Sequence, residues 1–274
     1  MDRDLALEAL GALCNSSVTS IQKQGSQPCA FSVGFHGGAP HQMCVKDFIC
    51  TVLDGDETCE VSRSSFCRMQ CALQGFGLTD QPQDHAVRAP TGRDLVIDED
   101  EFFDPKFDYD FRSLKDNETF YRGGEVYERP YGWFRFALKV LNKYDGNAWL
   151  GTRFRSTQSV SGEWPVSYHG TSRKGAEGII EGYYKPGSGQ AYGRGIYSTP
   201  YIDEAVYYTK TFTSNKTGKT YQVVLQNRIN TEYRQKHNND KYWLVPIPAG
   251  TSSTNEQDMV ERAIRPYGLL LKEV

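Results

Sequence analysis

Short strand-like runs separated by turn residues fill the second half of the chain, and they restrict the fold more than any other feature. Runs rich in β-branched and aromatic residues, bounded by Gly, Pro, Asn or Asp, predict strands. Five such runs occur, at residues 166–169, 195–198, 221–227, 242–245 and 269–272. Only two short helices are expected between them, at about residues 172–181 and 201–212. The sequence therefore predicts an α+β fold dominated by antiparallel strands.

A longer helix is predicted ahead of these strands, over residues 131–144. Its apolar residues recur at i, i+3, i+4, i+7, i+8 and i+11, the spacing of one helix face packed on a core. They are Trp133, Phe136, Ala137, Val140, Leu141 and Tyr144. Asp145-Gly146 would end this helix, because glycine readily takes the left-handed conformation that follows a helix.

The N-terminal residues predict a short amphipathic helix and not a secretory signal. Leucines recur near helical spacing at residues 5, 7, 10 and 13. A signal needs a basic start and an uninterrupted apolar stretch, which Asp2, Asp4 and Glu8 interrupt. We therefore expect an intracellular protein, cytoplasmic or nuclear, whose thiols stay reduced. The glycosylation sequons at Asn15, Asn117 and Asn215 are then interpreted as chance matches.

The composition narrows the class of partner. Hydrophobic residues make up 38% and aromatic residues 13% of the chain, as in folded proteins. The formal net charge of -3 shows no basic excess, so nucleic acid is not predicted as an obligate partner. No stretch approaches the roughly 20 apolar residues that a membrane-spanning helix needs, so no membrane segment is expected.

All seven cysteines lie between Cys14 and Cys71, and this asymmetry predicts two unlike parts. We expect a small Cys-rich accessory region over residues 1–84, an acidic linker over 85–128 and a catalytic domain over 129–274. The linker is inferred from three prolines and from the acidic run at residues 98–101.

The cysteine spacing leaves three interpretations open. Structural zinc sites usually contain cysteines two to four residues apart, and Cys67 and Cys71 meet that spacing, with His36 and His41 nearby. The same spacing also places two small apolar side chains on one helix face. Buried free thiols are the favoured interpretation, zinc is not favoured, and disulfides are the third alternative.

Two short motifs contain the residues with chemical character. Tyr168-His169-Gly170-Thr171 would place an imidazole at a strand end, beside a glycine that lets a ligand approach closely. Tyr192-Gly193-Arg194-Gly195-Ile196-Tyr197 leads into another strand and would hold backbone against a flat ligand. It differs from the dinucleotide-binding glycine fingerprint, which has a third glycine and opens a helix. Tyr207 and Tyr208 follow on the second short helix.

In order and spacing, these motifs resemble the nicotinamide pocket of the poly(ADP-ribose) polymerase-like ADP-ribosyltransferases. The resemblance covers residues 166–274 and implies an ADP-ribosyltransferase fold with NAD+ as substrate. It implies that His169 binds the nicotinamide ribose, that the Gly170 backbone holds the carboxamide, and that Tyr208 stacks on the nicotinamide ring. The implied catalytic residues are His169, Tyr197 and Lys241. The implied NAD+-binding residues are His169, Gly170, Thr171, Tyr192, Gly195, Tyr197, Ala205 and Tyr208.

Two positions depart from the family pattern. Lys241 stands where polymerising members carry a glutamate that orients the ribose hydroxyls, and a lysine cannot accept those hydrogen bonds. Ala205 falls where a serine hydroxyl usually holds the carboxamide, and such a loss costs about 0.5–1.5 kcal/mol. Polymer synthesis is therefore not expected. Four carboxylates are candidate replacements for the missing one: Glu232, Asp240, Glu256 and Glu261.

These residues predict a mono-ADP-ribosyltransferase that moves ADP-ribose from NAD+ to a protein or nucleic-acid acceptor and releases nicotinamide. A second interpretation is an inactive module of the same fold that binds NAD+ or ADP-ribose, and a third is a vestigial pocket. Lys241 and Ala205 favour the inactive module, whereas His169 and Tyr197 favour the enzyme. The sequence specifies neither the acceptor nor the oligomeric state.

Overall fold

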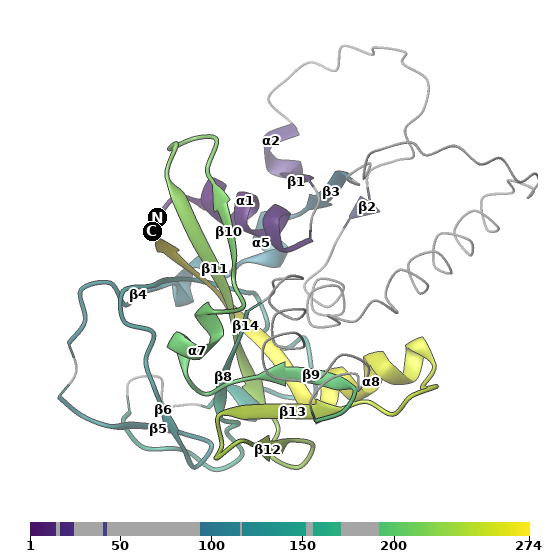
Figure 1. The fold of residues 1–274 in the computed structure, drawn as a ribbon. Helices are drawn as coiled ribbons and strands as arrows, with labels where there is room; N and C mark the ends of the chain where they lie inside the picture. Colours follow the sequence, from purple (N-terminus) through teal and green to yellow (C-terminus); the bar gives the residue numbers. More distant parts are fainter. Residues whose placement is uncertain (15–16, 25–40, 43–93, 116, 152–155, 171–191) are drawn as a thin grey trace, which may run out of the picture.

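The computed structural model describes residues 1–14, 17–24, 41–42, 94–115, 117–151, 156–170 and 192–274. In these residues the fold is mixed α+β and rich in antiparallel strands, as predicted (Figure 1). The largest sheet has the strand order β10-β11-β14-β7-β4, and β8 also pairs with β11. Its strands are β4 (Tyr109–Asp110), β7 (Phe134–Ala137), β8 (Val166–His169), β10 (Lys210–Thr213), β11 (Thr220–Ile229) and β14 (Ile264–Glu273).

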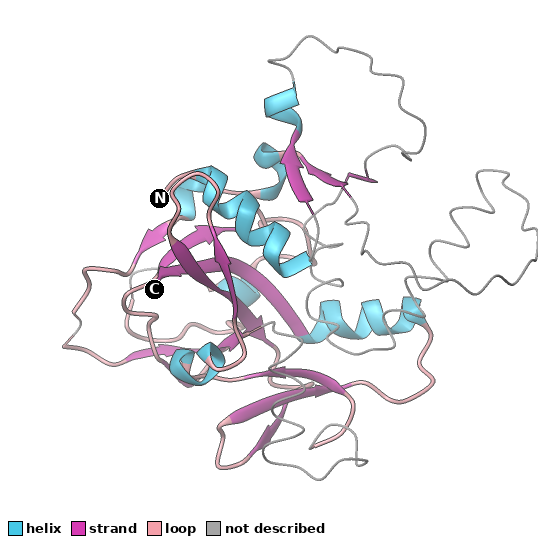
Figure 2. Cartoon of the chain, turned by 45° about the horizontal axis from the view of Figure 1, so that its top comes forward, coloured by secondary structure: helices cyan, strands magenta, loops and turns pink. Residues whose placement is uncertain are grey.

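The central strands β11 and β14 are buried on both faces, and different helices cover the two faces. Alternate residues of a strand point to opposite sides of its sheet. Val223 and Leu225 contribute to a core that also holds α1 (Arg3–Cys14) and α8 (Ser253–Ala263). Val224 lies in a second core with α7 (Ile202–Val206). Figure 2 shows the large sheet between these helices.

A second, smaller sheet lies beside the first one, below it in Figure 1. It contains β9 (Gly195–Ser198), β12 (Gln235–His237) and β13 (Tyr242–Pro246) in the order β12-β13-β9, with antiparallel pairing throughout. One pair of backbone hydrogen bonds, between Tyr168 of β8 and Thr199 after β9, joins the two sheets. The strands predicted at residues 166–169, 195–198, 221–227, 242–245 and 269–272 are therefore confirmed.

The helix predicted over residues 131–144 is wrong, because residues 134–137 form strand β7 and the rest of the segment is not helical. Phe134 and Phe136 pair with Leu271 and Leu269 of β14. Trp133, Phe136, Ala137 and Val140 are buried, as the periodicity indicated. The pattern therefore identified four of its six residues correctly as buried, whereas Leu141 and Tyr144 are half-buried. Pairing with a strand far along the chain outweighed the local preference for a helix.

The second short helix is also shorter than predicted. α7 ends at Val206, and residues 210–213 form β10, which pairs with β11. Threonine alternates with other residues at 209, 211 and 213, and β-branched side chains favour a strand. The helix predicted at residues 172–181 lies outside the described residues.

The N-terminal helix is confirmed as α1, and its leucines are buried in the core on one face of the large sheet. Further short elements are α2 (Ile21–Gln24), the two-stranded pair β5 (Phe120–Arg122) and β6 (Glu125–Tyr127), η2 (Ala148–Leu150), and a small parallel sheet of β1 (Ser17–Ser20), β2 (His41–Gln42) and β3 (Asp94–Ile97). Cys14 is buried in the core, and the other six cysteines lie outside the described residues.

Residues 94–128, expected to belong to a linker, contain ordered elements. Besides β3 to β6 they form α5 (Glu99–Phe102) and η1 (Pro105–Phe107). The acidic run caps α5, because the Asp98 carboxylate accepts hydrogen bonds from the Asp100 and Glu101 amides. Phe102 and Phe103 are buried. Part of the acidic run that indicated a linker thus stabilises a helix start. The domain boundaries at residues 84 and 128 stay predictions.

Candidate functional site

His169 lies where the two sheets separate. Hydrogen-bonded pairs alternate along an antiparallel ladder, so after Tyr168 and Thr199 the next such pair would be Gly170 and Tyr197. At this position the Tyr197 carbonyl lies 2.6 Å from Nδ1 of His169. A carbonyl can only accept, so Nδ1 carries the hydrogen and Nε2 is the ring atom that can accept from a ligand hydroxyl. The structure thus brings together His169 and Tyr197, 28 residues apart in the chain.

The Tyr197 hydroxyl closes the loop that precedes its own strand. It accepts a hydrogen bond from the Tyr192 amide at 3.0 Å and donates to the Gly193 carbonyl at 2.8 Å. Burial raises the pKa of this hydroxyl, so it remains protonated at neutral pH. Because the hydroxyl is occupied by the loop, the face of the ring is what Tyr197 can offer to a flat ligand.

Gly195 and Tyr192 fix this loop against the smaller sheet. Gly195 has φ of +156°, and a side chain there would collide with the Val245 carbonyl across the β9–β13 ladder. The ring of Tyr192 stacks on His237 of β12, with centroids 4.3 Å apart and planes 13° apart. Glycine at 195 is therefore required for the close approach of the two strands, and Tyr192 helps to form the wall of the smaller sheet.

Gly170 brings the end of β8 against α7. A methyl group at Gly170 would meet the Ala205 carbonyl and the backbone of Tyr208. Ala205 itself is buried in the core beneath α7. Thr171, the remaining predicted ligand of NAD+, lies outside the described residues. The backbone of Tyr208 thus lies against Gly170, the residue that follows His169, although the two come from separate segments.

Sequence reasoning missed Glu204, which contacts Lys241 directly and is linked to Tyr208 through Tyr242. Its Oε2 lies 2.9 Å from Nζ of Lys241, and its Oε1 accepts a hydrogen bond of 2.5 Å from the Tyr242 hydroxyl. The Tyr208 and Tyr242 hydroxyls lie 3.4 Å apart. Burial, then the bonds with Glu204 and Tyr208, raises the pKa of Tyr242. One signal was available, since the helix predicted over residues 201–212 would place Glu204 and Tyr208, four residues apart, on one face.

An open hollow of about 590 Å³ borders this pair. Acidic and amide side chains dominate its lining. The lining residues are Glu128, Tyr201, Asp203, Glu204, Tyr207, Asn238, Asn239 and Lys241. Burial and the nearby Asp203 carboxylate raise the pKa of Glu128. The hollow therefore lies between α7 and the turn that joins β12 to β13, and Glu204 forms part of its wall.

The four carboxylates proposed from the sequence have other contacts. Glu256 pairs with Arg194, and Asp240 lies 3.0 Å from Lys236. Glu232 is exposed in the turn after β11. The Glu261 carboxylate accepts a hydrogen bond from Gln257 within α8. Lys241 contacts Glu204, which is not one of these four carboxylates.

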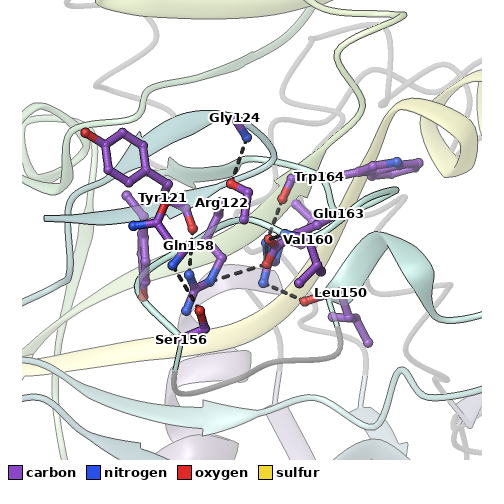
Figure 3. Close-up of polar contacts among 12 residues, drawn as sticks. Tyr121, Arg122, Gly124, Leu150, Ser156, Gln158, Val160, Glu163 and Trp164 are labelled. Atoms are coloured by element: carbon purple, nitrogen blue, oxygen red, sulfur yellow. Dashed lines mark hydrogen bonds and ion pairs between the residues drawn. The ribbon is translucent and has the colours of Figure 1, made fainter.

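A second carboxylate fixes the start of β8. Glu163 lies 3.3 Å from Arg122 and 3.1 Å from Arg228, and all three side chains are at most 6% exposed (Figure 3). Arg228 also donates to the carbonyls of Trp164 and Leu150. Burial lowers the pKa of Arg122, while Glu163 acts in the opposite direction. This cluster holds Glu163 and Trp164 in the segment that leads directly into β8, the strand carrying His169.

Compared with known proteins, the chain matches no protein-family model and no curated protein sequence. Within the described residues, no group of three or more His, Cys, Asp or Glu could hold a metal ion. The described helices include none that is long and apolar enough to cross a membrane. The function is therefore inferred from the site residues themselves.

Proposed function

We propose that the chain is an NAD+-dependent mono-ADP-ribosyltransferase. The observation that supports this most is the junction of the two sheets, where Nδ1 of His169 lies 2.6 Å from the Tyr197 carbonyl. His169, Gly170, Tyr197 and Tyr208 are the residues that the family resemblance assigns to the nicotinamide pocket. Three separate segments contribute them, and their contacts gather around the end of β8.

The reaction is a substitution at C1′ of the nicotinamide ribose. The bond from C1′ to the nicotinamide nitrogen breaks, and its electron pair neutralises the positive charge of the ring as nicotinamide leaves. An acceptor nucleophile forms the new bond to C1′ and loses its proton to water. His169 would accept a hydrogen bond from a ribose hydroxyl through Nε2, while Tyr208 would stack on the ring. Fixed polar groups of this kind stabilise the charge that develops in the transition state.

Single transfer, rather than chain elongation, follows from Lys241. Elongation needs an acceptor group that polarises the growing chain, and an ammonium offers only donors. Lys241 is also engaged with Glu204.

The two departures from the family pattern support a second candidate, a module that binds NAD+ or ADP-ribose but catalyses no reaction. Lys241 and the buried Ala205 are the residues that favour it. It predicts measurable binding of NAD+ with no release of nicotinamide.

The decisive experiment uses NAD+ labelled on the adenylate phosphate. We expect the wild-type protein to release nicotinamide and to place single labelled units on itself or on lysate components. The matched control is His169→Gln, whose side-chain amide can still donate a hydrogen bond but lacks the imidazole. Label retained in this variant would argue against the proposal. Binding of NAD+ without label or nicotinamide release would select the second candidate.

A further inference from the structure

Glu204 has the position and the contacts to replace the carboxylate that is missing from β13. We infer that Glu204 is a catalytic residue that accepts hydrogen bonds from the hydroxyls of the nicotinamide ribose. This inference rests on the proposed function. It concerns a residue on a different element from the one that the family resemblance assigns to this role.

The ion pair with Lys241 places Glu204 next to the expected position. Lys241 immediately precedes β13 and occupies the place of the family's glutamate. Oε2 of Glu204 lies 2.9 Å from its Nζ, although the two residues are 37 positions apart and belong to α7 and the edge of β13. A carboxylate therefore lies within ion-pair distance of Lys241, and it comes from α7 instead of β13.

The carboxylate is held firmly and still has capacity to accept further bonds. Only 11% of the Glu204 side chain is exposed, and its Oε1 accepts a hydrogen bond from Tyr242. A carboxylate has about four acceptor positions, and these contacts use one on each oxygen. Lys241 is 44% exposed. Because a long, exposed ammonium can move into water at small cost, a ribose hydroxyl can take its place.

A line of hydroxyl groups connects Glu204 to the proposed nicotinamide pocket. The Tyr242 hydroxyl donates to Glu204, and the Tyr208 hydroxyl lies 3.4 Å from that of Tyr242. The backbone of Tyr208 in turn lies against Gly170, the neighbour of His169. Glu204 thus belongs to the same contact network as the residues expected to hold the nicotinamide and its ribose. A carboxylate fixed there would also favour the positive charge that develops at C1′ when nicotinamide leaves.

The test is the rate of nicotinamide release by Glu204→Gln in the full chain, with NAD+ binding measured by calorimetry. We expect the rate to fall on the order of 10²-fold, while the dissociation constant of NAD+ changes far less. Asp203→Asn is the matched control, since it removes the same charge from the neighbouring residue of α7, in the wall of the same hollow. We expect its rate to stay within about twofold of wild type.

Exchanging the two charged residues distinguishes a loss of activity from a loss of folding. The double variant Glu204→Lys with Lys241→Glu keeps the ion pair and moves the carboxylate to the β13 side. We expect it to recover most of the activity that Glu204→Lys alone loses.

The outcomes separate this inference from the proposed function. If the wild type releases nicotinamide and Glu204→Gln matches it, or Asp203→Asn is equally slow, the role of Glu204 is overturned and the transferase stands. If the wild type neither binds nor cleaves NAD+, the proposed function fails, and this inference fails with it.

Discussion

Glu163 and Glu204 are both carboxylates that contact a cation, yet their surroundings differ. Glu163 is 4% exposed and lies between two guanidinium groups that are themselves 6% exposed. Glu204 contacts an ammonium that is 44% exposed and forms part of the wall of an open hollow. A carboxylate closed in by arginines can only stabilise the fold, whereas one with a mobile partner beside a hollow can exchange that partner for a ligand.

The largest loss of stability is expected at Glu163, the carboxylate enclosed by two arginines. Glu163→Gln would remove the carboxylate that pairs with the buried Arg122 and Arg228, and breaking a buried ion pair costs about 3–5 kcal/mol. The free energy of unfolding, measured by urea denaturation, should fall by this amount. Glu101→Gln is the control, because the Glu101 side chain is 61% exposed beside Lys139 and Lys143, and it should leave stability nearly unchanged. Equal losses of unfolding free energy in Glu163→Gln and Glu101→Gln would show that burial between the arginines does not make Glu163 special.

A smaller effect is expected at Gly170, between β8 and α7. In Gly170→Ala the new methyl group meets the Ala205 carbonyl and the Tyr208 backbone. Overpacking of this kind costs roughly 1–3 kcal/mol, and the displaced end of β8 should also weaken NAD+ binding. Thermal unfolding and calorimetry would measure the two effects. Unchanged binding would mean that this contact does not shape the pocket.

The smallest loss of stability is expected at the ion pair of Glu204 with Lys241, beside the hollow. Lys241→Met removes a half-exposed ion pair, which is worth less than about 1 kcal/mol and is screened by salt. The difference in unfolding free energy from wild type should therefore shrink further between low and high ionic strength. A salt-independent loss as large as that of Glu163→Gln would show that the Glu204 pair is structural as well.

The sequence predicted those parts of the fold whose signals are local. The runs at 166–169 and 242–245 form strands because their β-branched and aromatic residues, bounded by turn residues, favour strands whichever strand they pair with. Residues 131–144 were predicted wrongly, because the choice between helix and strand depended on pairing with β14, about 130 residues later. Periodicity identifies which residues are buried, but it does not identify the distant partner.

For the candidate site, the sequence again supplied those residues whose signals are local. His169, Gly170 and Tyr197 could be found because each lies in a short motif with a strand next to it. Glu204 has no such motif, and an acidic residue in the first turn of a helix is ordinarily a surface residue. Its contact with Lys241 exists only because α7 and the start of β13 lie close together in the folded chain.

His169, at the junction of the two sheets, has a role in the fold besides the role proposed for it in binding. Its imidazole donates to the part-buried Tyr197 carbonyl, which would otherwise need another donor, and a hydrogen bond of this kind contributes about 0.5–1.5 kcal/mol. Selection for a stable fold would therefore retain His169 whether or not a related chain binds NAD+. A histidine at this position in related sequences would then be weak evidence of activity, and the residue at position 204, with no role in the backbone ladder, would be the more informative one to compare.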